Sequence, residues 1–299
     1  MTMNKKAPVP ADCINRITPG QRLRQYLRHP GSLILFLLVC LSALVCAAIL
    51  VYLIVYIVVR GVPNLTLDLF ALEWNSENQS MVPALLNTVI MVLLSLLMAV
   101  PIGIFSAIYL VEYAKRGSRI VSVIRLTAET LSGIPSIVYG LFGYILFVLT
   151  LKWGFSLLAG AITLAVMVLP TIIRTTEEAL MAVSDTYREG SFGLGAGRVR
   201  TVFRVVLPSA VPGILAGIIL AIGRIVGESA ALIFTAGTAA AVPGSPFDSA
   251  RTLSVHMYCL MSEGLYTKQA YATAFVLLVL VVGINALSAF LAKKVQSKT

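Results

Sequence analysis

Charged residues are scarce in this chain: Asp, Glu, Lys and Arg make up 12% of its 299 residues, while hydrophobic residues make up 58%. A water-soluble domain carries about twice that share of charge, so a soluble fold is disfavoured. Several uncharged, mostly apolar runs reach about 18 residues or more, which is long enough to cross a bilayer as a helix. The short alternating segments of a membrane β-barrel are not found. These features predict an all-α protein that crosses a membrane several times.

Cysteine and histidine are also few, and they are not clustered. The cysteines are Cys13, Cys40, Cys46 and Cys259, and the histidines are His29 and His256. Since no CxxC pair occurs and the histidines lie far apart, neither a disulfide framework nor a metal site is expected. The sequence has no GxxxxGK[ST] motif and no HExxH motif, so nucleotide binding by this chain and an intramembrane enzyme are both disfavoured.

The net charge of +10 does not indicate nucleic-acid binding, because the basic residues fall mainly in alternate connections between the apolar runs. That distribution follows the positive-inside rule and places both termini in the cytoplasm. We expect a basic cytoplasmic tail over residues 1–32, a first transmembrane helix over 33–59 and a transmembrane core over 84–292. The six expected spans are residues 33–59, 84–111, 130–150, 155–173, 211–236 and 271–291.

Three connections carry further expectations. Residues 112–129 are basic and are expected to form a cytoplasmic loop. Gly133 and Pro135, near the start of the third span, predict a kinked or broken helix end. Residues 237–268 are rich in Pro and Gly, and we expect an outer connection there that includes a re-entrant or short helical piece.

The connection over residues 174–208 is patterned like a functional segment. A helix is expected from Glu177 to Tyr187, with Thr175 or Thr176 as its N-cap. Gly195 suits a tight turn between two short helices. Pro208 fits the start of the next helix, where its missing N–H costs little.

The spacing in this connection resembles the cytoplasmic loop of ABC importer permeases, which reads Glu-Ala-Ala, three residues, Gly, nine residues, Ile-x-Leu-Pro. The matching positions are Glu189, Gly195, Val205, Leu207 and Pro208, and Gly190 and Ser191 stand in place of the two alanines. The resemblance implies a type I importer transmembrane domain whose loop forms a coupling helix that docks on an ATPase subunit. Tyr187, Ser191 and Leu194 share one helix side by spacing and are candidate contacts. A solvated hairpin without a partner explains the charges but not the small residues followed by Leu-Pro.

The fifth expected span carries two charges in its interior, Arg224 and Glu228. Their spacing puts them on one face of a continuous helix. Arg224 would lie about 24 Å along it from Pro208. Charges at such depth are costly and are functional candidates by default. They fit an anion site, because a guanidinium can hold an oxyanion through two parallel hydrogen bonds. They also fit a self-neutralising pair that fixes helix packing.

The strings SGIPSIVYGLF, IIRTTEEAL and ILAIGRIVGESAALIFTA resemble the A-type permease subunit of the phosphate-specific importer. The resemblance implies that Arg174, Arg224 and Glu228 serve the passage of phosphate across the bacterial inner membrane. It implies as partners a second related permease, two ATPase subunits that bind ATP and Mg, and a periplasmic phosphate-binding protein. It also implies a link to a phosphate-sensing histidine kinase, and it places no cofactor in this chain itself.

Three alternatives stay open from the sequence alone. One is a permease for another oxyanion, such as sulfate, molybdate or phosphonate. Another is an ion-coupled secondary transporter, which needs no ATPase. The last is a structural or signalling membrane subunit, in which Arg224 and Glu228 would carry no flux.

Overall fold

The computed structural model describes residues 30–115 and 117–296, and within these ranges the regular structure is helical without any strand. The chain divides into two units, residues 1–56 and 57–299. The first unit contains most of α2 (Pro30–Gly61), an apolar helix whose residues are largely exposed. Its 32 residues extend about 48 Å, more than the thickness of a hydrocarbon core. The first transmembrane helix is therefore confirmed as a helix, while the basic tail expected over 1–32 lies almost wholly outside the described residues.

The second unit opens with two short 3₁₀ turns, η2 (Val62–Asn64) and η3 (Leu67–Phe70). Its first half then consists of α3 (Val82–Ile108), the π-helix η4 (Tyr109–Tyr113), α4 (Arg119–Ser132), α5 (Ser136–Gly143), the π-helix η5 (Tyr144–Thr150) and α6 (Leu157–Met181). Its second half consists of α7 (Asp185–Gly193), α8 (Arg198–Thr201), the π-helix η6 (Val202–Val206), α9 (Leu207–Val226), α10 (Ala230–Thr235), α11 (Leu253–Ser262) and α12 (Thr267–Gln296).

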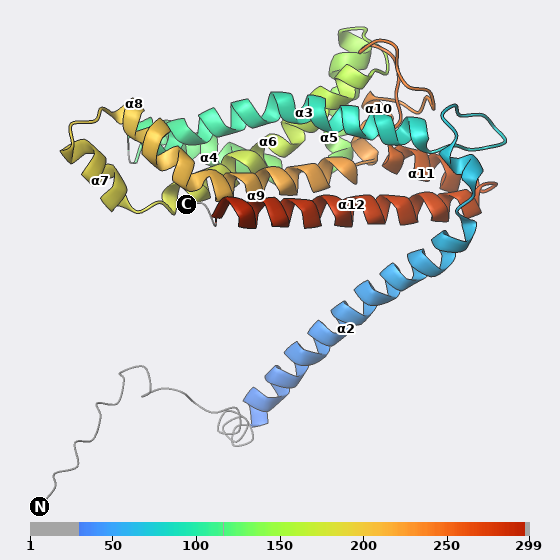
Figure 1. The fold of residues 1–299 in the computed structure, drawn as a ribbon, viewed down its shortest axis with the longest axis horizontal. Helices are drawn as coiled ribbons and strands as arrows, with labels where there is room; N and C mark the ends of the chain where they lie inside the picture. Colours follow the sequence, from blue (N-terminus) through green and yellow to red (C-terminus); the bar gives the residue numbers. More distant parts are fainter. Residues whose placement is uncertain (1–29, 116, 297–299) are drawn as a thin grey trace, which may run out of the picture. The chain divides into compact units, whose positions relative to one another are not determined.

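Helix α6 is the centre of the packed bundle. It lies between α3 and α9, and α12 packs on the other side of α9 (Figure 1). Two glycines allow the close approach. A Cβ on Gly103 of α3 would stand 2.6 Å from Cγ2 of Ile172, and one on Gly217 of α9 would overlap the side chain of Thr175. The apolar segment of α6 is 61% buried against 28% for that of α3, so α6 is the most enclosed of these helices.

The long helices give the bundle two ends (Figure 1). One end, which we call the α7 end, holds α7, α8 and the C-terminal part of α12. The other, the α11 end, holds η3, α10 and α11. Residues far apart in sequence therefore meet at each end.

Among the described residues, five helices are long and apolar enough to cross a membrane, and a bent pair, α4 with α5 and η5, makes up to six. The break predicted at Gly133 and Pro135 is confirmed, because the two members of this pair meet at 101°. The expectation of a loop over 112–129 was wrong for most of its length, since α4 is helical from Arg119. Residues 136–150 alone extend about 22 Å, short of a core about 30 Å thick, because the helix turns away at the break.

Two other boundaries differ from expectation. Helix α6 continues past Arg174 to Met181, so Thr175 and Thr176 lie inside a helix and cap nothing. The expected fifth span is broken: α9 ends at Val226 and α10 begins at Ala230. The short helical piece expected within 237–268 is confirmed as α11.

The α11 end contains a buried basic cluster. Arg251 is 6% exposed, and its guanidinium carbon lies 5.2 Å from the centroid of the Trp74 ring. His256 is fully buried beside it. Burial, and after it the charge of Arg251, lowers the pKa of His256 from 6.5 to about 3, against a smaller opposing effect of the Gln79 backbone. His256 is therefore neutral in the folded chain at ordinary pH.

Acidification should destabilise the chain through His256. The folded state takes up this proton only near pH 3, whereas the unfolded state takes it up below about pH 6.5, so stability falls as the pH falls between these values. At about pH 5 the loss is about 2 kcal/mol for this group. His256→Leu should lose less melting temperature than the parent between about pH 7.5 and about pH 5, measured by thermal unfolding of the purified protein. An identical loss in both proteins would contradict the assignment.

Candidate functional site

Helix α7 begins where the sequence provides a cap. The side chain of Ser184 accepts a hydrogen bond from the backbone N–H of Thr186, and Asp185 stands in the first turn, where the helix dipole favours an anion. The helix expected from Glu177 to Tyr187 was therefore placed too early. Residues 177–181 belong to α6, and the chain turns at 182–184 before the separate helix α7 forms.

The glycine and proline of the predicted pattern hold the positions that their chemistry suits. Gly195 has φ +82°, a left-handed conformation that ends α7, and its N–H donates to the carbonyl of Phe192. Pro208 stands at the start of α9, directly after the π-helix η6, as expected. Leu207 is the first residue of that helix and is half-buried.

The candidate contact residues do not all face outward. Tyr187 and Leu194 are 61% and 91% exposed, and Glu189 and Gly190 are exposed as well. The hydroxyl of Ser191 instead lies 2.8 Å from that of Thr201, so it ties α7 to α8 within the chain. Tyr187 and Leu194 are therefore available for contact with a partner, whereas the hydroxyl of Ser191 is engaged within the chain.

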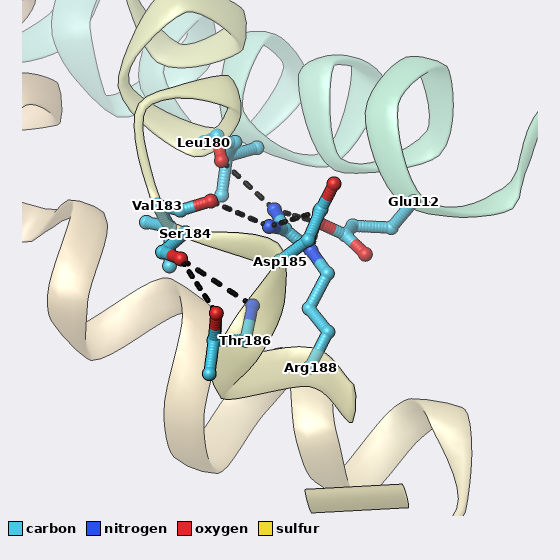
Figure 2. A network of polar contacts seen from close by, with 7 residues as sticks. All are labelled: Glu112, Leu180, Val183, Ser184, Asp185, Thr186 and Arg188. Atoms are coloured by element: carbon cyan, nitrogen blue, oxygen red, sulfur yellow. Dashed lines mark hydrogen bonds and ion pairs between the residues drawn. The ribbon is translucent and has the colours of Figure 1, made fainter. Parts of the chain in front are cut away.

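A buried ion pair fastens α7 to the rest of the bundle (Figure 2). Arg188 of α7 reaches Glu112 of η4, with Nη2 2.7 Å and Nε 3.1 Å from the same carboxylate oxygen. The two side chains are 14% and 9% exposed. Arg188 also donates to the carbonyls of Leu180 and Val183, at 2.9 and 2.7 Å, and to the exposed carboxylate of Asp185 at 3.1 Å. One side chain thus joins the end of α6, the start of α7 and η4.

A second arginine of the same segment contacts the same π-helix. The guanidinium carbon of Arg198, at the start of α8, lies 5.6 Å from the centroid of the Tyr113 ring. Such a cation–π contact is worth about 0.5–1 kcal/mol at an exposed position. Neighbouring residues of η4, Glu112 and Tyr113, therefore bind arginines from α7 and α8.

Arg174 lies on a cavity rather than in the core. The cavity measures about 440 Å³ and lies between α4 and α6, and its charged lining residues are Arg125, Glu129, Arg174, Glu177 and Glu178. Arg174 is exposed and its Nε is 3.1 Å from the carboxylate of Glu178, four residues on. Arg125 pairs with Glu177, whose side chain is 10% exposed. With two cations and three anions, this lining carries a small net negative charge.

Arg224 and Glu228 do not share a helix face, because the helix breaks between them. Arg224 is in the last turn of α9, and Glu228 follows the break at Gly227. No ion pair joins Arg224 to any carboxylate in the part of the chain that the structure describes. Each charge is instead placed favourably for a helix dipole, the cation at the end of α9 and the anion at the start of α10.

The surroundings of the two residues differ. Glu228 is 9% exposed, and its Oε1 accepts a hydrogen bond from the N–H of Ala231 at 3.0 Å. Arg224 is half-buried and interacts electrostatically with the hydroxyl of Tyr139, which donates to the carbonyl of Leu131 at the end of α4. Arg224 lies about 25 Å from the start of α9, and Arg174 about 10 Å from the end of α6, so they lie at different depths.

Comparison with known proteins agrees with this geometry. The family model described as "Binding-protein-dependent transport system inner membrane component" matches residues 99–298. The chain belongs to this family. The permease is accordingly a multi-pass protein of the inner membrane.

Individual relatives of the permease cover most of its length. The probable ABC transporter permease protein YqgI of Bacillus subtilis is 35% identical over 75% of this chain and 81% of its own. The phosphate transport system permease protein PstA of Haemophilus influenzae is 33% identical over 73% of this chain and 77% of its own. The phosphate transport system permease protein PstA of Mycobacterium leprae is 34% identical over 68% of this chain and 67% of its own.

Solved structures support the fold. A bacterial alginate ABC transporter, in complex with a periplasmic protein bound to an alginate pentasaccharide, contains a chain with TM-score 0.63 at 18% identity, over 90% of this chain and 99% of that one. The inward-facing MetNI methionine ABC transporter contains one with TM-score 0.56 at 19% identity, over 72% and 94%. The permease has the transmembrane fold of type I ABC importers.

Sequence reasoning missed the residues that hold the permease's α7 in place. Arg188 was not singled out in the sequence, and Glu112 was placed at the edge of an expected loop. The available signal was weak: Glu112 is an acid directly after a long apolar run, at the start of a connection whose charges are mostly basic.

Gly195 and Gly190 should respond differently to alanine in the permease. A side chain at φ +82° costs about 1–2 kcal/mol, so Gly195→Ala should raise the rate of tryptic cleavage after Arg198 by about 5- to 30-fold. A Cβ on Gly190 meets nothing within 4 Å, and it would stabilise the helix by about 0.5–1 kcal/mol. Gly190→Ala should therefore slow cleavage or leave it unchanged. Equal rates in the two variants would contradict the role of the left-handed turn.

Proposed function

We propose that this chain is the permease subunit of an ATP-driven importer that carries inorganic phosphate into the bacterial cytoplasm. The observation that carries the proposal is the joint occurrence of two features. A short helix, which contains the exposed Tyr187 and is followed directly by the exposed Leu194, projects at one end of the bundle. A half-buried Arg224, which forms no ion pair with a carboxylate among the described residues, lies in the last turn of the membrane helix α9. Relatives named as phosphate transport permeases support phosphate as the substrate.

Helix α7 acts as the coupling helix in this proposal. The α7 end would be cytoplasmic, and the exposed surface of α7 and of the following turn would fit into a groove of an ATPase subunit. Tyr187 and Leu194 supply apolar contact area, and the small Gly190 permits close approach. Leu207 and Pro208 pass the movement into α9, because a proline at a helix start fixes the direction in which the chain enters the helix.

Arg224 is the proposed phosphate-binding group. A guanidinium forms two parallel hydrogen bonds with a phosphate-like oxyanion, and burial strengthens them. Because its own carboxylate neighbour Glu228 is engaged with the N–H of Ala231, Arg224 does not have to give up an ion pair to bind the substrate. Glu228 still contributes negative charge near the site, which keeps the anion from binding too tightly to leave.

Arg174 is the proposed next position on the way inward. It lies nearer the α7 end than Arg224 and on the wall of the cavity between α4 and α6. Its exposed pair with Glu178 is worth about 0.2–1 kcal/mol, so an arriving phosphate could replace that carboxylate. The net negative lining then favours release over retention.

The remaining subunits of the transporter would be other chains. The partners we propose are a second related permease subunit, two ATPase subunits and a periplasmic phosphate-binding protein, with a histidine kinase where phosphate is sensed. ATP and Mg would be bound by the ATPase subunits, and this chain would carry no catalytic site. The exposed apolar faces of α2 and of the bundle would contact lipid or the second permease.

Loss of the Arg224 charge should abolish phosphate uptake without disrupting the complex. Arg224→Gln is expected to lower uptake at low external phosphate by about 100-fold or more, since a charge-assisted bidentate contact is lost in a site of low dielectric. Lys268→Gln removes the same charge from an exposed position at the α11 end and serves as the control. Normal uptake by the Arg224 variant would contradict the assignment. Competition by sulfate, molybdate or phosphonate in the parent would redirect the choice of substrate.

Removal of Glu178 should strengthen the hold of Arg174 on the anion. Glu178→Gln is expected to lower the KM for phosphate and also to lower kcat, because the freed guanidinium binds more tightly and releases more slowly. Initial rates of uptake over a range of phosphate concentrations would measure both constants. If neither constant changes, Arg174 does not meet the substrate on this path.

A further inference from the structure

The π-helix η4, at the end of α3, receives contacts from both short helices of the α7 end. Arg188 of α7 binds Glu112, and Arg198 of α8 lies over Tyr113. These contacts join residues far apart in sequence, and they come from two separate helices of the segment that would dock on the ATPase. The function proposed above gives Leu207, Pro208 and α9 as the way in which movement of α7 reaches the membrane. The contacts with η4 form a second connection, to α3.

The Arg188 side chain connects several elements and is not a solvated surface charge. It donates to Glu112 of η4, to the carbonyl of Leu180 in α6, to the carbonyl of Val183 in the turn after α6, and to Asp185 of α7 (Figure 2). The pair with Glu112 is almost fully buried, and separating buried charges leaves each without compensation. The end of α6, the start of α7 and η4 should therefore move together.

The conformation of η4 makes it a suitable receiver of movement. Its backbone bonds span five residues, as in the bond from the N–H of Ala114 to the carbonyl of Tyr109, at 2.9 Å. Such π-helical turns are rare and frequently occur at functional sites. Helix α3, which leads into η4, packs against α6. At Gly103 the two helices are so close that an added Cβ would stand 2.6 Å from Cγ2 of Ile172. A displacement of η4 thus passes into a tightly packed helix pair.

We propose that Arg188 and Arg198 clamp the α7–α8 segment onto η4, and that this clamp makes α3 a direct receiver of the movement that ATP binding imposes on α7. Arg188 is a positioning residue in this account, since it acts through Glu112 and touches no substrate. The inference rests on the proposed function, because it assumes that α7 docks on an ATPase. It adds a second route to the one through Pro208, and it predicts that hydrolysis and transport can be separated at Glu112.

The test uses the complete transporter in proteoliposomes with its binding protein. Phosphate uptake and ATP hydrolysis are measured together, and the ratio of ATP hydrolysed to phosphate imported is the readout. Glu112→Gln keeps the shape of the side chain and removes its charge. We expect it to raise the ratio by about fivefold or more, since coupling between sites is typically of this size or larger. A purely structural residue would lower both rates in proportion and leave the ratio unchanged.

Two further variants make the result decisive. Asp185→Asn removes the exposed partner of the same arginine, at 69% side-chain exposure, and should change the ratio by less than about twofold. Tyr113→Leu removes only the contact with Arg198 at a partly exposed position, so it should assemble normally and raise the ratio by about twofold. The double variant Glu112→Gln with Tyr113→Leu should raise the ratio more than either single substitution does.

The outcomes separate the clamp from the proposed function. The clamp would be overturned if Glu112→Gln and Tyr113→Leu both showed the same ratio of ATP hydrolysed to phosphate imported as the parent. It would also be overturned if the rates of hydrolysis and uptake fell in proportion. If the Glu112 variant does not assemble, an unchanged ratio in Tyr113→Leu overturns it alone. A parent complex that imports no phosphate with ATP contradicts the proposed function instead, whatever the variants do.

Discussion

The low dielectric of the bilayer is the constraint on which this structure depends. A backbone group without a hydrogen bond, or a charge without compensation, is costly there, so the chain must be helical wherever it meets lipid. The breaks in its helices are therefore places where side chains complete the backbone bonding. At the break after Val226, the carboxylate of Glu228 accepts from Ala231, and the hydroxyl of Ser254 donates to the carbonyl of Glu228. A charged residue at this depth thus has a structural use beside the proposed functional one.

The same constraint explains why polar contacts concentrate at the bundle ends. Around α6 the packing is made by small residues and apolar side chains, with glycines at the closest approaches. At the α7 end, Arg188 donates to the carbonyls of Leu180 and Val183, which lie in the last turn of α6 and just after it, where helical carbonyls run short of intrahelical donors. At the α11 end, Arg251 lies over Trp74 in a similar way. Apolar contacts in the interior therefore set the packing of the long helices, and polar contacts at the ends hold the connecting segments.

The features that sequence reasoning found were those set by local chemistry. Uncharged length predicted most of the spans, Gly133 and Pro135 predicted the bend, and the left-handed Gly195 and the helix-starting Pro208 followed from what those residues permit. The features that it missed depend on distant partners. Thr175 and Thr176 resemble helix caps, but α6 continues through them, and Thr175 packs against Gly217 of α9. Arg224 and Glu228 have ideal helical spacing, and only the tertiary contacts of α10 reveal the break. Arg188 finds Glu112 on another helix, beyond the reach of any local pattern.

The π-helical turn at the end of α3 has a consequence for the register of that helix. Accommodating one extra residue rotates everything on one side of the turn by about 100° relative to an unbroken α-helix. Because Glu112 lies inside this turn, its position around the helix axis depends on that offset. Deletion of a single residue within Tyr109–Tyr113 would leave the apolar length of α3 almost unchanged, yet it would turn the carboxylate away from its arginine. At this turn, the number of residues therefore matters as well as their identity.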